Sequence, residues 1–192
     1  MRKHLPTILL VLVFLVGLSL LLYPAVSDYW NSLHATRAIE DYVQQVAGID
    51  DDLYAEILEN ASAYNQALND RPWSLELETE EELQNYASQL NVGGSGQMGY
   101  VEIPKIDCLL PIYHGTSEGT LARNVGHLEG SSLPVGGEST HCVISGHRGL
   151  PSARLFTDLD QLVEGDTFLL HTLDETLTYE VDQIRIAVVN IF

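Results

Sequence analysis

A long apolar run near the N-terminus constrains the fold of this chain more than any other feature. Residues 8–23 carry no charged side chain and are mostly leucine, valine and isoleucine. Together with Leu5 they approach the ~20 apolar residues that a helix needs to cross a bilayer, and Tyr23 suits the far membrane interface. We therefore predict that residues 1–27 form a cytoplasmic tip and a signal-anchor transmembrane helix.

A cleaved secretory signal is the alternative interpretation of this run. Such a signal has a shorter apolar core and a small-x-small cleavage site, for which residues 25–27 (AVS) are a poor match. Arg2 and Lys3 precede the run, whereas acidic residues follow it. Because positive charge stays on the cytoplasmic side, the sequence predicts a single-pass protein of the cell membrane with its main domain outside the cell.

The chain as a whole is strongly acidic. Its 192 residues include 9 lysines and arginines against 27 acidic residues, which gives a formal net charge of −18. Such a surface repels nucleic acid and anionic lipid headgroups, so neither is an expected partner. The length suits one domain with a sizeable core and an appendage.

Two cysteines, Cys108 and Cys142, are present. In an exported domain they could form a disulfide, but their separation in sequence says nothing about geometry, so this pairing stays open. No CxxC pair or cluster of histidine and cysteine indicates a metal site, and no cofactor is predicted.

Residues 28–68 have a helical pattern. Apolar residues recur at spacings of three and four from Ile39 to Val46, and again from Leu53 to Leu68. Between them, residues 48–52 (GIDDD) supply a helix stop and acidic capping candidates for a second helix. We predict a helical hairpin over residues 28–68.

Residues 69–98 are predicted to be a lid-like segment and a flexible linker. Pro72 ends the second helix because proline cannot continue it. The acidic run that continues through Glu82 is typical of a solvated surface, and residues 92–97 (VGGSGQ) are typical of a flexible connector.

From residue 99 onward the pattern is that of β-structure. Alternating apolar residues from Ile106 to Ile112 predict a strand, and a short helix or turn is expected near residues 155–162. Short strands separated by glycine, proline and aspartate predict an antiparallel barrel or sandwich, so the fold class is mainly β. Further strands are expected at residues 100–103, 141–145, 167–172 and 177–189.

Residues 140–151 (THCVISGHRGLP) contain the strongest candidate for catalysis. A short predicted strand runs into His147, which lies between Gly146 and Gly149. The two glycines leave room for close approach of another segment, and such a context presents a single imidazole at a strand end. His147 is therefore the candidate catalytic residue. Structural roles are expected for His34, His114, His127 and His171.

Several partners for His147 can be weighed from the residues alone. Neither Ser145 nor Ser139 lies in the Gly-x-Ser-x-Gly turn that presents a serine nucleophile. Cys142 is five positions away, roughly 16 Å along an extended strand and on the opposite face, so it fits a small buried residue better than a nucleophile. A glycosidase with a carboxylate pair stays open, although no two carboxylates stand out.

The combined pattern resembles the class C (pilus-type) sortases. The resemblance includes the apolar N-terminal run, the helical hairpin ending in 63–68 (AYNQAL) and the strand 99–106 (GYVEIPKI). It continues through 110–116 (LPIYHGT), 126–137 (GHLEGSSLPVGG) and 145–151 (SGHRGLP) in the order typical of the family. It implies a sortase-type β-barrel over residues 99–192, with His147 as the active-site histidine.

The resemblance also implies an activity and partners. Sortases of this class are cysteine transpeptidases on the outer face of a Gram-positive cell membrane. A thiolate attacks an LPXTG-like sorting signal of a pilin or surface protein, and an amine resolves the thioester. That amine is a pilin lysine or a cell-wall group. The histidine donates and accepts protons, and an arginine stabilises the oxyanion.

The sequence departs from the family pattern in two places. The cysteine of the family lies in a TLxTC-type strand well after the histidine, with the arginine a further strand later, and the sequence stops before both. We therefore expect an incomplete barrel with exposed edges that lacks its nucleophile and is prone to instability. The Asp-Pro-aromatic lid of the family is also altered, because Arg71 precedes Pro72 and Trp73.

A second hypothesis concerns a protein without catalysis. A membrane-anchored β domain with the same pattern could bind sorting-signal peptides or a partner sortase. The two hypotheses differ in one outcome. A transpeptidase converts a sorting-signal peptide into a product, and this conversion depends on His147, whereas a binding domain forms no product.

Overall fold

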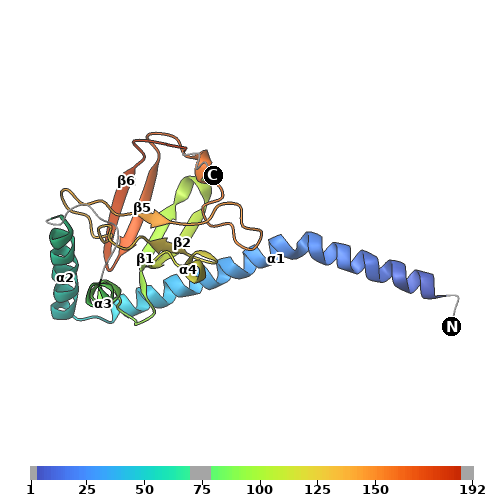
Figure 1. Ribbon diagram of the computed structural model, residues 1–192, viewed down its shortest axis with the longest axis horizontal. Coiled ribbons are helices and arrows are strands. Elements are labelled where there is room, and N and C mark those ends of the chain that lie inside the picture. Colours follow the sequence, from blue (N-terminus) through green and yellow to red (C-terminus); the bar gives the residue numbers. More distant parts are fainter. Residues whose placement is uncertain (1–3, 70–78, 187–192) are drawn as a thin grey trace.

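The structure, a computed structural model, describes residues 4–69 and 79–186. Its most prominent element is a single helix, α1 (Leu5–Ala47), whose N-terminal half projects away from the rest of the protein (Figure 1). Pro6 stands in its first turn, where the missing N–H costs nothing, and Gly48 follows its end. The predicted anchor and the first helix of the predicted hairpin are therefore one continuous helix.

The two halves of α1 have different surroundings. Residues 8–26 are exposed although they are mostly apolar, and α1 is long and apolar enough to span a bilayer by length and composition. The C-terminal half buries a stripe with helical spacing against the sheet. The buried side chains of this stripe are Ala35, Ile39, Tyr42 and Val46.

The second helix, α2 (Asp51–Asn69), begins as the acidic run predicts. The Asp50 carboxylate accepts a hydrogen bond of 2.8 Å from the Leu53 amide and so caps the first turn. Near its end, the buried Asn65 side chain bonds both backbone groups of Leu133, accepting from the amide at 2.7 Å and donating to the carbonyl at 3.2 Å. This peptide-like pairing fixes α2 against the loop that precedes the candidate site.

A third helix, α3 (Glu80–Ser88), lies in the segment expected to be a linker. Thr79 and Glu82 form a reciprocal capping box, in which each side chain accepts from the backbone amide of the other residue. The helix carries Tyr86, which is buried among the other helices. α3 thus adds a buried side chain to the core, although most of residues 79–90 are exposed. Trp73 and the rest of the lid-like sequence lie outside the described residues.

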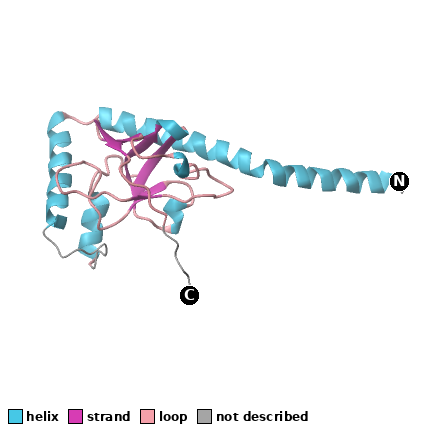
Figure 2. Cartoon of the chain, turned by 90° about the horizontal axis from the view of Figure 1, so that it is seen from above, coloured by secondary structure: helices cyan, strands magenta, loops and turns pink. Residues whose placement is uncertain are grey.

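Six strands form one curled sheet with the order β4-β3-β2-β1-β5-β6 (Figures 1 and 2). All neighbours are antiparallel except β2 and β3, which are parallel and are joined through the short helix α4 (Glu118–Leu121). The sheet agrees with the predicted barrel type. The strands are β1 (Gln97–Ile103), β2 (Cys108–His114), β3 (Val125–His127), β4 (Ile144–Ser145), β5 (Thr167–Thr172) and β6 (Glu175–Glu180).

Several details differ from the expectation. β3 was not expected, β4 is shorter than the predicted 141–145, and β6 ends earlier than the predicted 177–189. Over the described residues, helices contain more residues than strands, because α1 alone has 43. The mainly β character therefore belongs to the sheet-bearing part from β1 onward.

The sheet separates two cores. One lies between the helices and the sheet, and the other lies inside the curl. β1 contributes to both because successive side chains point to opposite faces. The helix-side core contains Tyr42, Val46, Ala61, Tyr86, Leu90, Met98, Leu133 and Leu173. The inner core contains Val101, Ile103, Ile106, Cys108, Ile112, Val125, Leu162 and Leu170.

Tyr42 joins α1 to two parts of the sheet. Its buried hydroxyl donates to the Met98 carbonyl of β1 at 3.0 Å and accepts from the Leu173 amide at 2.7 Å, in the turn between β5 and β6. Burial raises the pKa of this phenol to about 12, so it stays a neutral donor.

We expect Tyr42→Phe to destabilise the full chain by about 1–3 kcal/mol, because it leaves the buried Leu173 amide without an acceptor. Urea unfolding in detergent micelles, followed by circular dichroism, measures this change. Tyr29→Phe is the control, since Tyr29 is 66% exposed on the same helix. Equal stabilities for the two variants would contradict the role given to the Tyr42 hydroxyl.

Candidate active site

His147 lies immediately beyond β4, at one edge of the sheet. β4 pairs with β3, where Ser145 stands opposite Gly126 and Ile144 opposite His127. Gly146 then carries the chain out of the sheet, and the His147 side chain is exposed. The structure thus places His147 just past the end of a strand, with its side chain in solvent.

Gly146 allows a close approach that no other residue permits. A Cβ atom at this position would lie 2.7 Å from Cδ2 of Phe156 and 2.8 Å from Cγ1 of Val125. Real Cβ contacts essentially never fall below 3.0 Å. The corner before His147 is therefore packed between the sheet and the loop that returns from Phe156.

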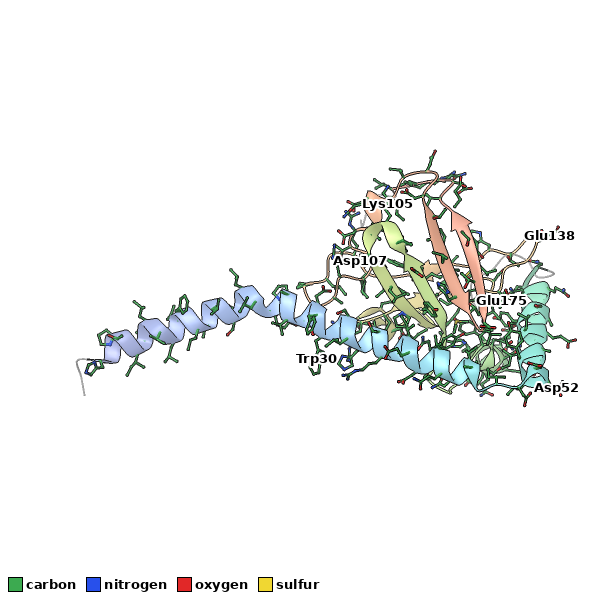
Figure 3. All side chains as sticks on the ribbon, turned by 180° about the vertical axis from the view of Figure 1, so that it is seen from behind. Trp30, Asp52, Lys105, Asp107, Glu138 and Glu175 are labelled. Carbon is green, nitrogen blue, oxygen red and sulfur yellow. The ribbon has the colours of Figure 1, made fainter. Side chains whose placement is uncertain are left out.

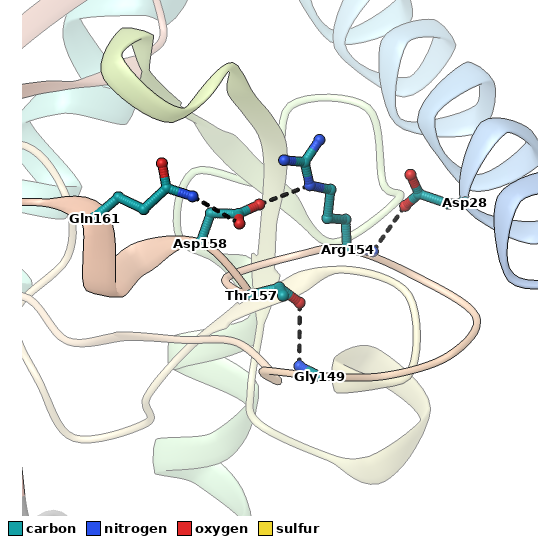
Figure 4. Close-up of polar contacts among 6 residues, drawn as sticks. All are labelled: Asp28, Gly149, Arg154, Thr157, Asp158 and Gln161. Carbon is teal, nitrogen blue, oxygen red and sulfur yellow. Dashed lines mark hydrogen bonds and ion pairs between the residues drawn. The ribbon is translucent and has the colours of Figure 1, made fainter.

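The loop after His147 folds back on itself. The His147 carbonyl accepts from the Phe156 amide at 3.2 Å, and the Gly149 amide donates to Oγ1 of Thr157 at 3.1 Å (Figure 4). Gly149 has φ of +74°, a left-handed conformation that suits glycine. These bonds fix the backbone of His147 while its side chain stays in solvent.

Both arginines near the histidine are engaged in ion pairs. Arg148 contacts Asp160 at 2.6 Å, and Arg154 contacts Asp158 at 2.6 Å (Figure 4). The arginine side chains are 62% and 61% exposed, so these pairs contribute little to stability. Neither arginine is held in a buried position from which it could stabilise an oxyanion.

A trough of about 920 Å³ opens inside the curl of the sheet, near the site. Its floor is apolar and comes from β1, β5 and β6, and its rim includes residues 180–185. The strands at the ends of the sheet order, β4 and β6, each have one sheet neighbour among the described residues. Lining side chains include Val101, Ile103, Cys142, Phe156, Phe168 and Tyr179.

Both cysteines are thiols whose surroundings disfavour ionisation. Cys108 is buried on β2, and burial raises its pKa to about 11. Cys142 is half-buried at the trough, and burial raises its pKa to about 12. They are not joined in a disulfide. A nucleophilic cysteine requires a stabilised thiolate, and neither residue has one.

Two other histidines support the fold beside the site. His127 on β3 is fully buried, with Nε2 2.8 Å from the Ser132 carbonyl and Nδ1 2.9 Å from the Tyr86 hydroxyl. Burial lowers its pKa to about 4, so it is neutral, donates from Nε2 and accepts from Tyr86. The His114 ring nitrogens lie 2.8 Å from the carbonyls of Gly96 and Gln89. Both side chains have the structural roles that were expected.

Among the described residues, no group of three or more histidine, cysteine or acidic side chains is arranged to hold a metal ion. Tyr86 is the residue near the site that the sequence analysis overlooked. Its hydroxyl forms a hydrogen bond with His127 and accepts one from the Gly115 amide at 3.1 Å. The capping box before α3 was the available signal for it.

Comparison with known proteins agrees with this geometry. Residues 101–190 match the Sortase domain family. Sortase C1 from Streptococcus agalactiae is 51% identical, with a TM-score of 0.74 over 78% of this chain and 77% of that chain. Sortase C from Streptococcus pneumoniae is 43% identical, with a TM-score of 0.65 over 77% and 74%.

A curated relative, Sortase D from Bacillus subtilis (strain 168), is 36% identical over 88 residues. This match covers 46% of the present chain and 41% of the relative, so the chain spans about two fifths of that relative's length. These matches define the class of protein to which the chain belongs. The chain belongs to the sortase family, and its structural neighbours include class C sortases.

We expect Gly146→Ala to destabilise the protein by about 1–3 kcal/mol, because the new methyl group overlaps Phe156 and Val125. Thermal unfolding of the full chain measures the change. Gly119→Ala is the matched control, since the atom that its added Cβ would meet among the described residues is Oγ of Ser117, at 3.8 Å. A Gly146→Ala protein as stable as the control would contradict the close packing of this corner.

We expect both cysteines to react slowly with iodoacetamide. At pH 8 the folded chain should be modified at least about 100-fold more slowly than the urea-unfolded chain, because a raised pKa leaves little thiolate. The rate should rise about tenfold per pH unit up to pH 10, below the pKa of either thiol. Mass spectrometry of each cysteine peptide measures it. A plateau near pH 7 at either cysteine would identify a reactive thiol instead.

Proposed function

We propose that this protein acts as a sortase transpeptidase on LPXTG-like sorting signals of pilin or surface proteins. The observation that carries the proposal is the exposed His147, held beyond an edge strand beside an apolar trough. It occurs in a chain 51% identical to sortase C1 from S. agalactiae. The accepting amine would be a pilin lysine or a cell-wall group.

The proposed chemistry has two steps. A thiolate attacks the carbonyl carbon of the threonine in the signal, and the C–N bond to glycine breaks while the His147 imidazolium protonates the leaving amine. The threonyl carbonyl is then held as a thioester. The incoming amine attacks it, the C–S bond breaks, and the neutral His147 takes up the proton from the new amide nitrogen.

The proposal assigns the nucleophile to neither Cys108 nor Cys142. Both thiols have pKa values raised by burial, and Cys108 is almost fully enclosed in the inner core. Because these are the two cysteines of the sequence, the attacking thiol would belong to a segment other than these 192 residues. A strand pairing with β4 beyond Ser145 would bring such a thiol beside His147.

We also propose that α1 anchors the protein in the cell membrane as a single span, with the sheet-bearing domain outside the cell. The apolar half of α1 is exposed over residues 8–26. Arg2 and Lys3 precede it, and the acidic domain follows. Positive charge on the cytoplasmic side supports this orientation.

A second candidate function, binding without catalysis, is favoured by the two unreactive thiols. The open trough could accept an extended sorting-signal peptide or a strand of a partner sortase, with β4 and β6 as pairing edges. In that case peptide would bind the chain and no covalent intermediate would form.

The transpeptidase proposal is tested by restoring a thiol. The full chain in detergent micelles is extended with the C-terminal segment of sortase C1 from S. agalactiae, and an LPXTG peptide is supplied with hydroxylamine. Hydroxamate should form, and His147→Ala should lower its rate about 10²–10⁴-fold because general acid–base catalysis is lost. His34→Ala, a substitution of an exposed histidine on α1, is the control.

Hydroxamate formed at the same rate by the His147→Ala chimera would contradict the role of His147. Saturable peptide binding by the chain and the chimera, with no hydroxamate from either, would support binding without catalysis. Mass spectrometry detects the hydroxamate, and fluorescence anisotropy of a labelled peptide measures the binding.

A further inference from the structure

One turn of α1, just after its exposed apolar half, contacts the loop that follows His147. Oγ of Ser27 donates to the Ser152 carbonyl at 2.9 Å, and Nδ2 of Asn31 donates to the same oxygen. The Asp28 carboxylate accepts from the Arg154 amide at 2.8 Å (Figure 4). We call Ser27, Asp28 and Asn31 the exit turn.

The exit turn holds the backbone of the loop. All three of its bonds reach main-chain groups, so they specify the path of residues 152–154 and not the side chains there. Between the bonded residues, Ala153 is 2% exposed. Leu155, 7% exposed, has φ of +37°, a conformation that is costly for leucine and persists only where the surroundings impose it.

Hydrogen bonds continue from the exit turn to His147. The Thr157 amide donates to the Arg154 carbonyl at 2.8 Å, and Oγ1 of Thr157 accepts from Gly149. The Phe156 amide then donates to the His147 carbonyl. The backbone of His147 is therefore connected to α1 through consecutive bonds of one short loop.

The exit turn occupies the start of the packed stripe of α1. Asp28 and Asn31 precede Ala35 and Ile39 at helical spacing, so the polar contacts and the buried apolar contacts lie on one face. At 1.5 Å per residue, Ser27 lies about 6 Å beyond Tyr23 along the helix. Trp30, 61% exposed, lies on the side of α1 away from the strands (Figure 3).

We propose that the exit turn positions His147, so that the geometry of the imidazole depends on how the anchor helix leaves the membrane. With the apolar half of α1 in the bilayer, residues 27–31 lie at the level of the headgroups, where an exposed Trp30 is typical. The loop of residues 152–154 is then held at that level. This inference rests on the proposed function for the role of His147 and makes Ser27, Asp28 and Asn31 positioning residues.

Two nearly isosteric substitutions in the exit turn are expected to have different effects on the loop. Asn31→Asp replaces the donating amide by a carboxylate that repels the Ser152 carbonyl, whereas Asp28→Asn keeps an oxygen that can accept from Arg154. The measurement is hydrogen exchange of the Arg154 and Phe156 amides in the full chain in lipid nanodiscs. In Asn31→Asp this exchange should be at least about 10-fold faster, because the bond from residue 31 to the Ser152 carbonyl no longer opposes local opening of the loop. In Asp28→Asn it should stay within about twofold of the wild type.

The matched control is Ser32→Ala. Ser32 follows Asn31 on the same helix, and its hydroxyl donates to the Tyr29 carbonyl within α1 instead of reaching the loop. Its exchange rates at Arg154 and Phe156 should equal those of the wild type. Asp28→Ala, which removes the acceptor, should accelerate exchange of the Arg154 amide.

A second measurement separates positioning from mere attachment. The ¹³Cε1 resonance of the His147 imidazole should shift or broaden in Asn31→Asp and stay in place in Asp28→Asn and Ser32→Ala. Faster exchange with an unchanged His147 resonance would overturn the positioning claim. Unchanged exchange in Asn31→Asp, or equal acceleration in Ser32→Ala, would overturn the contact itself.

Neither measurement requires turnover, so they stand even where the transpeptidase proposal fails. In the chimera that forms hydroxamate, Asn31→Asp should lower kcat about 10-fold with little change in KM for the peptide, because a displaced imidazole affects the chemical step and not peptide binding. A change in KM alone would count against positioning.

Discussion

The packing of α1 against the sheet is the constraint on which the rest of the structure depends. The buried stripe from Ala35 to Val46 closes the helix-side core, and the Tyr42 hydroxyl joins β1 to the turn between β5 and β6. Since α1 is continuous from Leu5 to Ala47, with Pro24 inside it, the helix that packs on the sheet also carries the apolar half.

The acidic composition restricts how positive charge is used near the site. Lys105, Arg148 and Arg154 each pair with an aspartate at 2.6 Å. These pairs are exposed and weak, so they organise loops more than they stabilise the fold. A guanidinium that stabilises an oxyanion must be fixed and partly shielded from water, and neither Arg148 nor Arg154 meets that condition.

Sequence patterns predicted the parts of this protein that depend on local periodicity. The apolar run and the helix stop at Gly48 follow from spacing alone, and the alternation from Ile106 to Ile112 predicted β2, although the strand itself begins at Cys108. β3 has three residues and the parallel pairing with β2, so its existence depends on a long-range partner that periodicity cannot reveal. α3 was missed because its acidic surface conceals one buried residue, Tyr86. The glycines beside His147 singled it out as a candidate, whereas the contacts between α1 and the loop after His147 join residues more than 120 positions apart.

His147 is held from two directions by different physical means. On the sheet side, the absence of a side chain at Gly146 lets Phe156 and Val125 close around the corner. On the helix side, the exit turn fixes the backbone at Ser152 and Arg154. Both constraints act on the main chain, and the imidazole itself stays exposed. In the proposed reaction, a thiol carried on a strand that pairs with β4 would reach His147 along the β4 edge, which has no second sheet neighbour among the described residues.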